Sequence, residues 1–201
     1  MMIRREFLIS GSVLAGLSVS TEPGFAQTWS ERYRSSKPIE MVKLDLNEMV
    51  PGQQLLVKLH SGPVAVRFRT QEEIDQARAT SLSELPDRYA RNANLPSDAV
   101  ATDDNRSFGE NSQWLVYRPI CTHLGVVTLS AHKPFGSEPF LINCPSHGGR
   151  YDSAGRVRAG PPRKNLPIPP VRFLSKGIVE IKSHDSFSNE RHVRNRHPSD
   201  W

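Results

Sequence analysis

The two cysteines of this 201-residue chain each stand close to a histidine, in a loop that also contains glycine. One loop reads CTHLG and holds Cys121 and His123, whereas the other reads CPSHGG and holds Cys144 and His147. Thiolates and imidazoles are common protein ligands of zinc and of iron–sulfur clusters. The pairing of one thiol with one imidazole in each of two loops therefore predicts a metal centre.

Three interpretations of this pattern compete. A disulfide between Cys121 and Cys144 would account for the cysteines, but it leaves the histidines and glycines without a role. A zinc site could use the same four side chains, yet structural zinc sites usually pair like ligands, as in C-x2-C. A [2Fe–2S] centre with two thiolates on one iron and two imidazoles on the other needs one of each from two facing loops. The mixed pairing favours this cluster.

The residues around the two loops fit a cluster site. Gly125, Gly148 and Gly149 allow the backbone to approach a ligand closely and offer N–H groups to bridging sulfides. Tyr151 stands shortly after the second loop, where its hydroxyl can reach a cysteine sulfur. We expect a rigid glycine–proline loop at 160–162 to cover the cluster.

The segments that must position these loops read as short strands. Runs at 39–46, 54–60 and 64–69 are bounded by turns, which predicts an antiparallel meander, and 64–69 alternates as a half-buried strand does. The apolar run 114–120 leads directly into the first loop, and 172–182 reads as a terminal hairpin. The 16 prolines and 13 glycines agree with a mainly β fold rich in turns.

One helix interrupts this pattern. Residues 70–82 begin with Thr70 and Glu73 at the spacing of a capping box, and their thin apolar stripe predicts a helix on the surface. Residues 83–112 read as a long irregular insertion, and 121–170 read mostly as loops.

The N-terminus reads as a targeting segment. Arg4 and Arg5 precede an apolar run at 7–19, which is the pattern of a twin-arginine export signal. That run is shorter than the roughly 20 apolar residues of a spanning helix. A cleaved signal and a retained anchor both remain open for residues 1–27, and 28–38 reads as a hinge.

Composition narrows the possible partners. The net charge is +5, but the basic residues are scattered and no dense basic tract occurs, so nucleic acid is not an expected partner. Hydrophobic residues make up 37% of the chain, which argues against a polytopic membrane protein.

The motifs CTHLG, CPSHGGRYD, GRVRAGPP and NLPIPP resemble the Rieske iron–sulfur subunit of the ubiquinol–cytochrome c oxidoreductase (bc1) complex. The upstream stretch DLNEMVPGQQLLVKLHSGPVAVRFRTQEEIDQAR and the RREFL start are also similar to that family. The resemblance covers residues 3–10 and 39–182. It implies a mainly β, Rieske-type antiparallel sandwich at 39–182, with a small cluster-binding subdomain whose loops span 121–163. Residues 183–201, beyond the resemblance, are polar and charged and read as a tail.

The resemblance also implies a site. Cys121 and Cys144 would bind the inner iron of a [2Fe–2S] cluster, and His123 and His147 would bind the outer, solvent-facing iron. By its position in the second motif, His147 is the candidate quinol contact. The remaining candidates are the cluster donor and the residues that cover the cluster: Tyr151, Leu124, Gly148, Gly160 and Pro161.

The implied function is electron transfer from ubiquinol to cytochrome c1. The chain would work beside cytochrome b and cytochrome c1 in a dimeric bc1 complex, and its enzymatic label, ubiquinol–cytochrome c reductase, belongs to that complex. The twin-arginine signal would place the cluster domain on the periplasmic side of the bacterial inner membrane. Two alternatives are an exported small subunit of another oxidoreductase, such as arsenite oxidase, and a Rieske ferredoxin.

The chain departs from the family pattern. Val126 and Ser146 stand where the family has two further cysteines, so the disulfide that ties its cluster loops cannot form here. Gly149 stands where the family has a serine whose hydroxyl donates to a bridging sulfide, and the resemblance would place Arg163 near the rim of the cluster. Because hydrogen bonds to cluster sulfurs stabilise the reduced state, we expect a lower reduction potential than is typical of the family.

Overall fold

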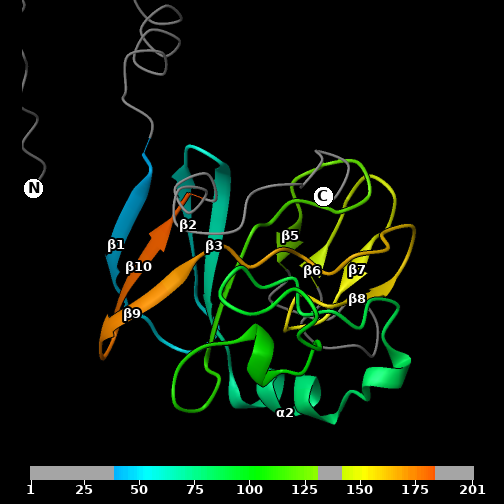
Figure 1. Cartoon of the computed structure of the whole chain (residues 1–201), viewed down its shortest axis with the longest axis horizontal. Helices are drawn as coiled ribbons and strands as arrows, with labels where there is room; N and C mark the ends of the chain where they lie inside the picture. Colours follow the sequence, from blue (N-terminus) through cyan, green and yellow to red (C-terminus); the bar gives the residue numbers. More distant parts are fainter. Residues whose placement is uncertain (1–38, 131–141, 184–201) are drawn as a thin grey trace, which may run out of the picture. The chain divides into compact units, whose positions relative to one another are not determined.

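The computed structural model describes residues 39–130 and 142–183. The predicted signal or anchor at 1–27, the hinge at 28–38 and the tail beyond Ser183 lie outside the described residues. Within the described part the chain forms three antiparallel sheets, with strand orders β1–β10–β9, β2–β3–β4 and β5–β6–β7–β8 (Figure 1). The strands are β1 (Met41–Asp45), β2 (Gln54–Leu59), β3 (Gly62–Phe68), β4 (Trp114–Tyr117), β5 (Leu129–Ser130), β6 (Ile142–Asn143), β7 (Arg150–Tyr151), β8 (Val157–Ala159), β9 (Val171–Ser175) and β10 (Ile178–Lys182).

The first three strands do not form the predicted meander. β2 and β3 make the expected hairpin, but β1 pairs with β10, with Met41 opposite Lys182 and Asp45 opposite Ile178. A backbone hydrogen bond of 2.9 Å, from His60 N–H to the Ile39 carbonyl, joins the start of the β1 segment to the end of the hairpin's first strand. The partner of β1 lies more than 130 residues further along the chain, so no local pattern indicates it.

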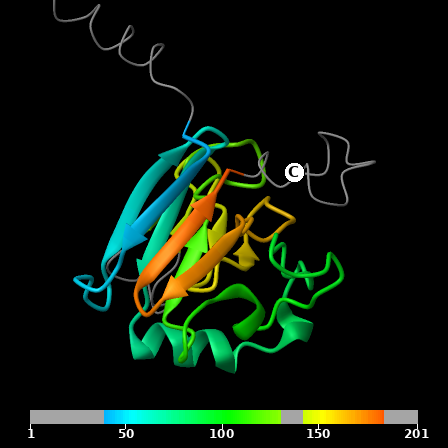
Figure 2. The same cartoon turned by 60° about the vertical axis from the view of Figure 1, so that its left-hand side comes forward.

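The β2–β3–β4 sheet has a hydrophobic core on each of its faces. Val66 and Val116 face a core shared with β1 and β10, whereas Ala65 and Leu115 face a second core that contains both cysteines. Successive side chains of a strand point to opposite faces, so each strand supplies both cores in alternation. The prediction of a half-buried strand at 64–69 was therefore wrong, because both of its faces are covered. Figures 1 and 2 show the sheet with β1, β9 and β10 on one side and β5 to β8 on the other.

Helix α2 (Gln71–Ala79) begins with the predicted capping box. The Thr70 hydroxyl accepts a hydrogen bond from the Glu73 N–H at 3.3 Å, and the Glu73 carboxylate accepts one from the Thr70 N–H at 3.2 Å. The same carboxylate is buried and pairs with the guanidinium of Arg67 on β3. A buried charge is tolerated when an opposite charge and hydrogen bonds compensate it, so this pair fixes α2 against the central sheet.

The small β5–β8 sheet was not predicted, because 121–170 read as loops. Its strands are two or three residues long, which is too short for a visible alternation of polar and apolar residues. Tyr151 on β7 and Ile142 on β6 pack into the core that contains the cysteines. The sheet therefore carries the second cysteine loop, between β6 and β7, directly over the central sheet.

The 83–112 insertion packs more closely than its sequence suggested. The short 3-10 helix η1 (Leu82–Glu84) overlaps its start, and η2 (Asp104–Arg106) lies within it. Arg106 is fully buried and donates to the carbonyls of Ala154 at 2.6 Å and Leu166 at 2.8 Å, and also to those of Ala90 and Gly155. Burial lowers the pKa of Arg106 to about 9, so it remains protonated at neutral pH. Arg106 thus ties the insertion to two segments that follow the second cysteine loop, at 154–155 and at Leu166.

Candidate metal centre

The first cysteine loop leaves β4 and closes on itself. The Cys121 N–H donates to the Val126 carbonyl at 2.7 Å, and the Gly125 N–H donates back to the Cys121 carbonyl at 2.9 Å. Gly125 has a φ of +76°, a left-handed conformation that glycine adopts without strain. The chain is thereby turned so that the residues between Cys121 and Gly125 form an exposed tip.

The second loop, between β6 and β7, has the same hydrogen bonds at the same positions. The Cys144 N–H donates to the Gly149 carbonyl at 2.8 Å, and the Gly148 N–H donates to the Cys144 carbonyl at 3.2 Å. Gly148 also adopts a left-handed conformation, with a φ of +67°. The two loops are therefore built alike, although their sequences share only the cysteine, the histidine and the glycine.

Within this common frame the thiols lie inside and the imidazoles outside. Cys121 and Cys144 are 2% and 3% exposed, and both are free thiols in the hydrophobic core. His123 and His147 are exposed, and their ring centroids lie 5.0 Å apart with the rings perpendicular. The structure thus brings the four side chains together as a buried pair and an exposed pair.

The buried Cys144 thiol lies in surroundings that favour its thiolate. Burial by itself raises the pKa of Cys144. The backbone N–H groups of Ser146 and His147 and the side chain of Cys121 lower it, and the net shift of the pKa is downward. Thiolate is the form that binds metals, so the loop backbone prepares this sulfur as a ligand.

Tyr151 supplies a side-chain donor to the other sulfur. Its hydroxyl lies 3.5 Å from the Cys121 sulfur, to which it donates, and accepts a hydrogen bond from the Thr122 N–H at 3.0 Å. Burial, with the Cys121 side chain as a further cause, raises the pKa of Tyr151. The hydroxyl therefore stays protonated and can act as a donor at neutral pH.

The 160–162 segment lies against the second loop. Gly160 has a φ of +87°, and a Cβ atom there would lie 2.6 Å from the Gly148 carbonyl oxygen. A Cβ atom on Gly149 would lie 2.6 Å from Cγ of Pro162, which is buried. Pro161, between them, is half-buried. The two segments approach so closely that glycine is required on both sides of the contact.

The other residues singled out from the sequence lie around these loops. Leu124 is 66% exposed beside His123, so it forms part of the exposed tip. Val126 is half-buried and packs on the core of the cysteines, whereas Ser146 and Arg163 are exposed. The two positions that hold cysteines in the family pattern thus have different surroundings in this chain.

Sequence reasoning missed Thr122 and the backbone of Lys164. The Thr122 hydroxyl lies 3.1 Å from the Tyr151 hydroxyl and donates to the Lys164 carbonyl at 2.6 Å. This bond joins the first loop to the segment after Pro162, so Thr122 links all three segments of the site. The only sequence signal was its place between the first cysteine and its histidine.

The donor set can be compared with the needs of each metal. No three histidine, cysteine, aspartate or glutamate side chains within 39–130 and 142–183 lie close enough together to hold one ion. A [2Fe–2S] cluster does not require such a group, since each iron takes two protein ligands and its other ligands are the bridging sulfides. A buried thiol pair beside an exposed imidazole pair fits that division.

Comparison with known proteins decides the family. The family model for the Rieske [2Fe–2S] domain matches residues 78–170. The ubiquinol–cytochrome c reductase iron–sulfur subunit of Cereibacter sphaeroides is 37% identical over 181 residues, which cover 89% of this chain and 94% of the relative. The chain belongs to the Rieske iron–sulfur subunit family. The same subunit of Rhodobacter capsulatus is 36% identical over 191 residues, covering 89% of this chain and 94% of the relative.

Membership of the Rieske family confirms two of the predictions, the mainly β fold and the [2Fe–2S] cluster. Among solved structures, a chain titled "Hyperthermophilic respiratory Complex III" aligns with a TM-score of 0.40 and 20% identity, covering 68% of this chain and 71% of that one. In the described part of this Rieske chain, no helix has the length and apolar character needed to cross a membrane.

Proposed function

We propose that this chain is the electron-transfer subunit of a bc1-type complex, carrying single electrons from ubiquinol to cytochrome c1. The observation that carries the proposal is the buried thiol pair beside an exposed imidazole pair, held in two matching loops. The relatives at 36–37% identity, both named ubiquinol–cytochrome c reductase iron–sulfur subunits, support it.

In this proposal Cys121 and Cys144 bind the inner iron, and His123 and His147 bind the outer iron. The cluster supplies one-electron redox chemistry between quinol and haem. The buried sulfurs are shielded from water by the surrounding core, whereas the imidazoles are presented at the surface, where a partner can reach them. Tyr151, through its bond to the Cys121 sulfur, would stabilise the more negative, reduced state.

His147 is the proposed quinol contact. Oxidation of one quinol releases two electrons and two protons. An exposed imidazole nitrogen of His147 would accept one proton as one electron leaves the quinol for this subunit, and the second electron and proton would pass to other groups of the complex. Leu124, Gly148, Gly160 and Pro161 would shape the exposed rim around the imidazoles.

The N-terminal sequence supports a location for the cluster domain in the cell. Arg4 and Arg5 support export by the twin-arginine pathway, which carries folded proteins. The cluster domain would then lie on the periplasmic side of the bacterial inner membrane, with cytochromes b and c1 as partners in a dimeric complex. Whether residues 1–27 are kept as an anchor or cleaved would be read from the N-terminus of the mature protein.

Complementation tests this function. In a strain without its own copy of the gene, membranes with the wild-type chain should reduce cytochrome c with ubiquinol, and the chain should co-purify with haem proteins. Cys144→Ser should abolish the cluster and the activity. Ser146→Ala, in the same loop but exposed and not a ligand, should retain both. Co-purification with a molybdenum subunit instead of cytochromes would overturn the proposal in favour of another oxidoreductase.

A further inference from the structure

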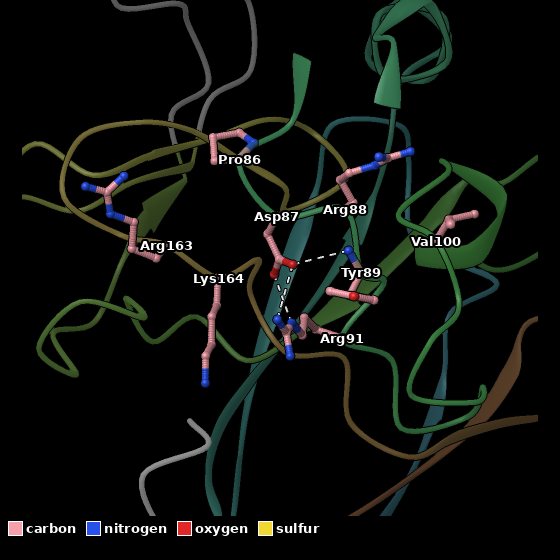
Figure 3. Close-up of a pocket in the computed structure, with 8 residues that line it drawn as sticks. All are labelled: Pro86, Asp87, Arg88, Tyr89, Arg91, Val100, Arg163 and Lys164. Carbon is pink, nitrogen blue, oxygen red and sulfur yellow. Dashed lines mark hydrogen bonds and ion pairs between the residues drawn. The ribbon is translucent and has the colours of Figure 1, made fainter. Parts of the chain in front are cut away.

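A basic cleft lies beside the loops of the metal centre. Its volume is about 530 Å³, and one wall comes from the 83–112 insertion while the other comes from the segment after Pro162 (Figure 3). The residues that line it are Pro86, Asp87, Arg88, Tyr89, Arg91, Val100, Arg163 and Lys164. The Lys164 carbonyl accepts the 2.6 Å hydrogen bond from Thr122, the residue between Cys121 and His123. The cleft is therefore directly attached to the first cysteine loop.

The positive charge of the cleft is largely uncompensated. Its one carboxylate, Asp87, is buried and accepts hydrogen bonds from the Arg91 guanidinium at 2.9 Å and the Asn165 N–H at 2.9 Å. The other three cations of the cleft form no ion pair with any residue in the described part of the chain; they are Arg88, Arg163 and Lys164. Charges that are not paired within the molecule remain available to attract a partner.

The walls of the cleft are held in place by backbone hydrogen bonds. Ala90 N–H donates to the Ala99 carbonyl at 2.7 Å, and Ala101 N–H donates to the Arg88 carbonyl at 2.8 Å, which pairs the two arms of the insertion. The Asn165 amide then joins the insertion to the opposite wall, donating to the Tyr89 carbonyl at 2.8 Å. A surface fixed in this way loses little conformational entropy when a partner binds.

The cleft also offers exposed apolar groups on this fixed backbone. Tyr89 is 49% exposed and Val100 41% exposed, on two antiparallel segments of the insertion that an isolated β-bridge joins at these residues. The Arg91 guanidinium lies 5.3 Å from the centre of the Tyr89 ring, which favours one orientation of the ring. Tyrosine and arginine are enriched at the centres of protein–protein interfaces, so this combination fits a protein partner.

We propose that this basic cleft, lined by Arg88, Tyr89, Arg163 and Lys164, is the docking surface for an acidic face of the protein that accepts the electron. The inference rests on the proposed function, because it assumes that the electron leaves toward another protein. In Figure 3 Arg88 extends to one side of the cleft, while Arg163 and Lys164 extend away from it on the other. The cations do not converge on one point, so a broad acidic surface fits them better than a small anion does. In the docked pair one electron passes from the reduced cluster to the ferric haem of the acceptor, which becomes ferrous.

Stopped-flow mixing tests the docking surface without any quinol. The full chain, purified in detergent with its cluster reduced by dithionite and excess reductant removed, is mixed with purified, oxidised cytochrome c1 at several salt concentrations. Electrostatic steering changes association rates by about 10- to 1,000-fold, so we expect the low-salt rate constant to fall at least about tenfold in Arg163→Glu/Lys164→Glu and in Arg88→Glu. Both variants should also lose most of the salt dependence.

The matched control is Lys176→Glu, which reverses the charge of an exposed lysine in the turn between β9 and β10. Lys176 does not line the cleft, so this variant should behave as the wild type. Reduction potentials are measured for each variant, and a fall in rate explained by a changed potential counts against docking. If the wild-type chain does not reduce cytochrome c1, the proposed function fails. If it does so and the glutamate variants are equally fast, the docking surface fails while the function stands. Loss of binding to phosphatidylglycerol vesicles with unchanged electron transfer would assign the surface to lipid and overturn the proposal.

Discussion

Gly149 and Pro162 are in a contact that leaves no room for a side chain, because a Cβ atom on Gly149 would lie 2.6 Å from Cγ of the proline. The hydroxyl that the family pattern places at 149 therefore cannot be restored here by a single substitution. Pro162 occupies that space instead, and a Cβ atom on Gly149 would also lie 3.4 Å from the Cβ atom of Cys144.

We expect Gly149→Ala to destabilise the protein by about 1–3 kcal/mol, the usual cost of overpacking a filled site, and to lower cluster occupancy. Pro162→Ala should relieve this cost in the double variant, so that the two effects are strongly non-additive. Chemical unfolding of both single variants and the double variant measures the coupling. If the changes in unfolding free energy of the two single variants add up to that of the double variant, the contact with Pro162 is not what excludes a side chain at residue 149.

Tyr151→Phe should lower the reduction potential, because it removes the hydroxyl that donates to the Cys121 sulfur. If this hydrogen bond stabilises the reduced state by about 1 kcal/mol, its removal lowers the reduction potential by about 40 mV for a one-electron couple. Tyr117→Phe is the control, since that hydroxyl lies in the same core but donates to Gln54 at 3.2 Å. Redox titration of the bound cluster compares the two, and equal potentials in wild type and Tyr151→Phe would contradict the assigned role.

The wild-type potential stays a prediction as well. Gly149 has no side chain that could donate to a cluster sulfur, and Tyr151 donates to the sulfur of Cys121 in the described part of the chain. We therefore expect a value in the lower half of the range of about −150 to +300 mV known for Rieske centres. A redox titration that places the cluster near the top of this range would refute the expectation.

Removal of the iron should loosen the two loops, because no disulfide ties them together. Hydrogen exchange is expected to accelerate by about tenfold or more, the signature of local opening, at the N–H groups of Cys121, Gly125, Cys144 and Gly148. Amides of β3 and β4 serve as the internal control and should stay protected. Equal protection of the loop amides with and without the cluster would mean that packing alone holds them.

Arg106→Met should destabilise the fold by about 3–5 kcal/mol, since it removes the hydrogen bonds to four buried carbonyls. The Gly155 carbonyl keeps the Leu166 N–H as a donor at 2.9 Å, whereas the carbonyls of Ala90, Ala154 and Leu166 lose the arginine donor. Arg106→Lys keeps the charge but cannot reach all four carbonyls, so an intermediate loss is expected. Arg172→Met provides the comparison, because Arg172 is 68% exposed and pairs with Glu180 at 3.1 Å, a kind of pair worth about 1 kcal/mol or less. Similar unfolding free energies for Arg106→Met and Arg172→Met would contradict the structural role assigned to Arg106.

Local features could be predicted from the sequence, and long-range ones could not. The capping box of Thr70 and Glu73 and the hairpin of β9 and β10 depend on residues a few positions apart, and both are present. The pairing of β1 with β10 joins distant segments that carry no mutual signal. Arg67 and Arg106 were missed for another reason: arginine is usually exposed, and nothing in a sequence marks the buried carboxylate or carbonyls that compensate its charge.

The same division applies to the site. The types and spacing of the four predicted ligands indicated which side chains belong together. Their arrangement as a buried and an exposed pair required the backbone of both loops. The contact between Gly149 and Pro162 could not be foreseen, because it depends on how two separate segments meet.

The position of the β2–β3–β4 sheet between two cores has a consequence for how the molecule comes apart. β3 and β4 contribute alternate side chains to both cores. If these strands come apart, both cores lose their packing together. Heating should therefore melt the described domain in one cooperative transition. The small sheet that carries the second cysteine loop cannot be cut out and studied as a free-standing module, because Ala65, Leu115 and Tyr117 of its core would remain behind in the rest of the protein.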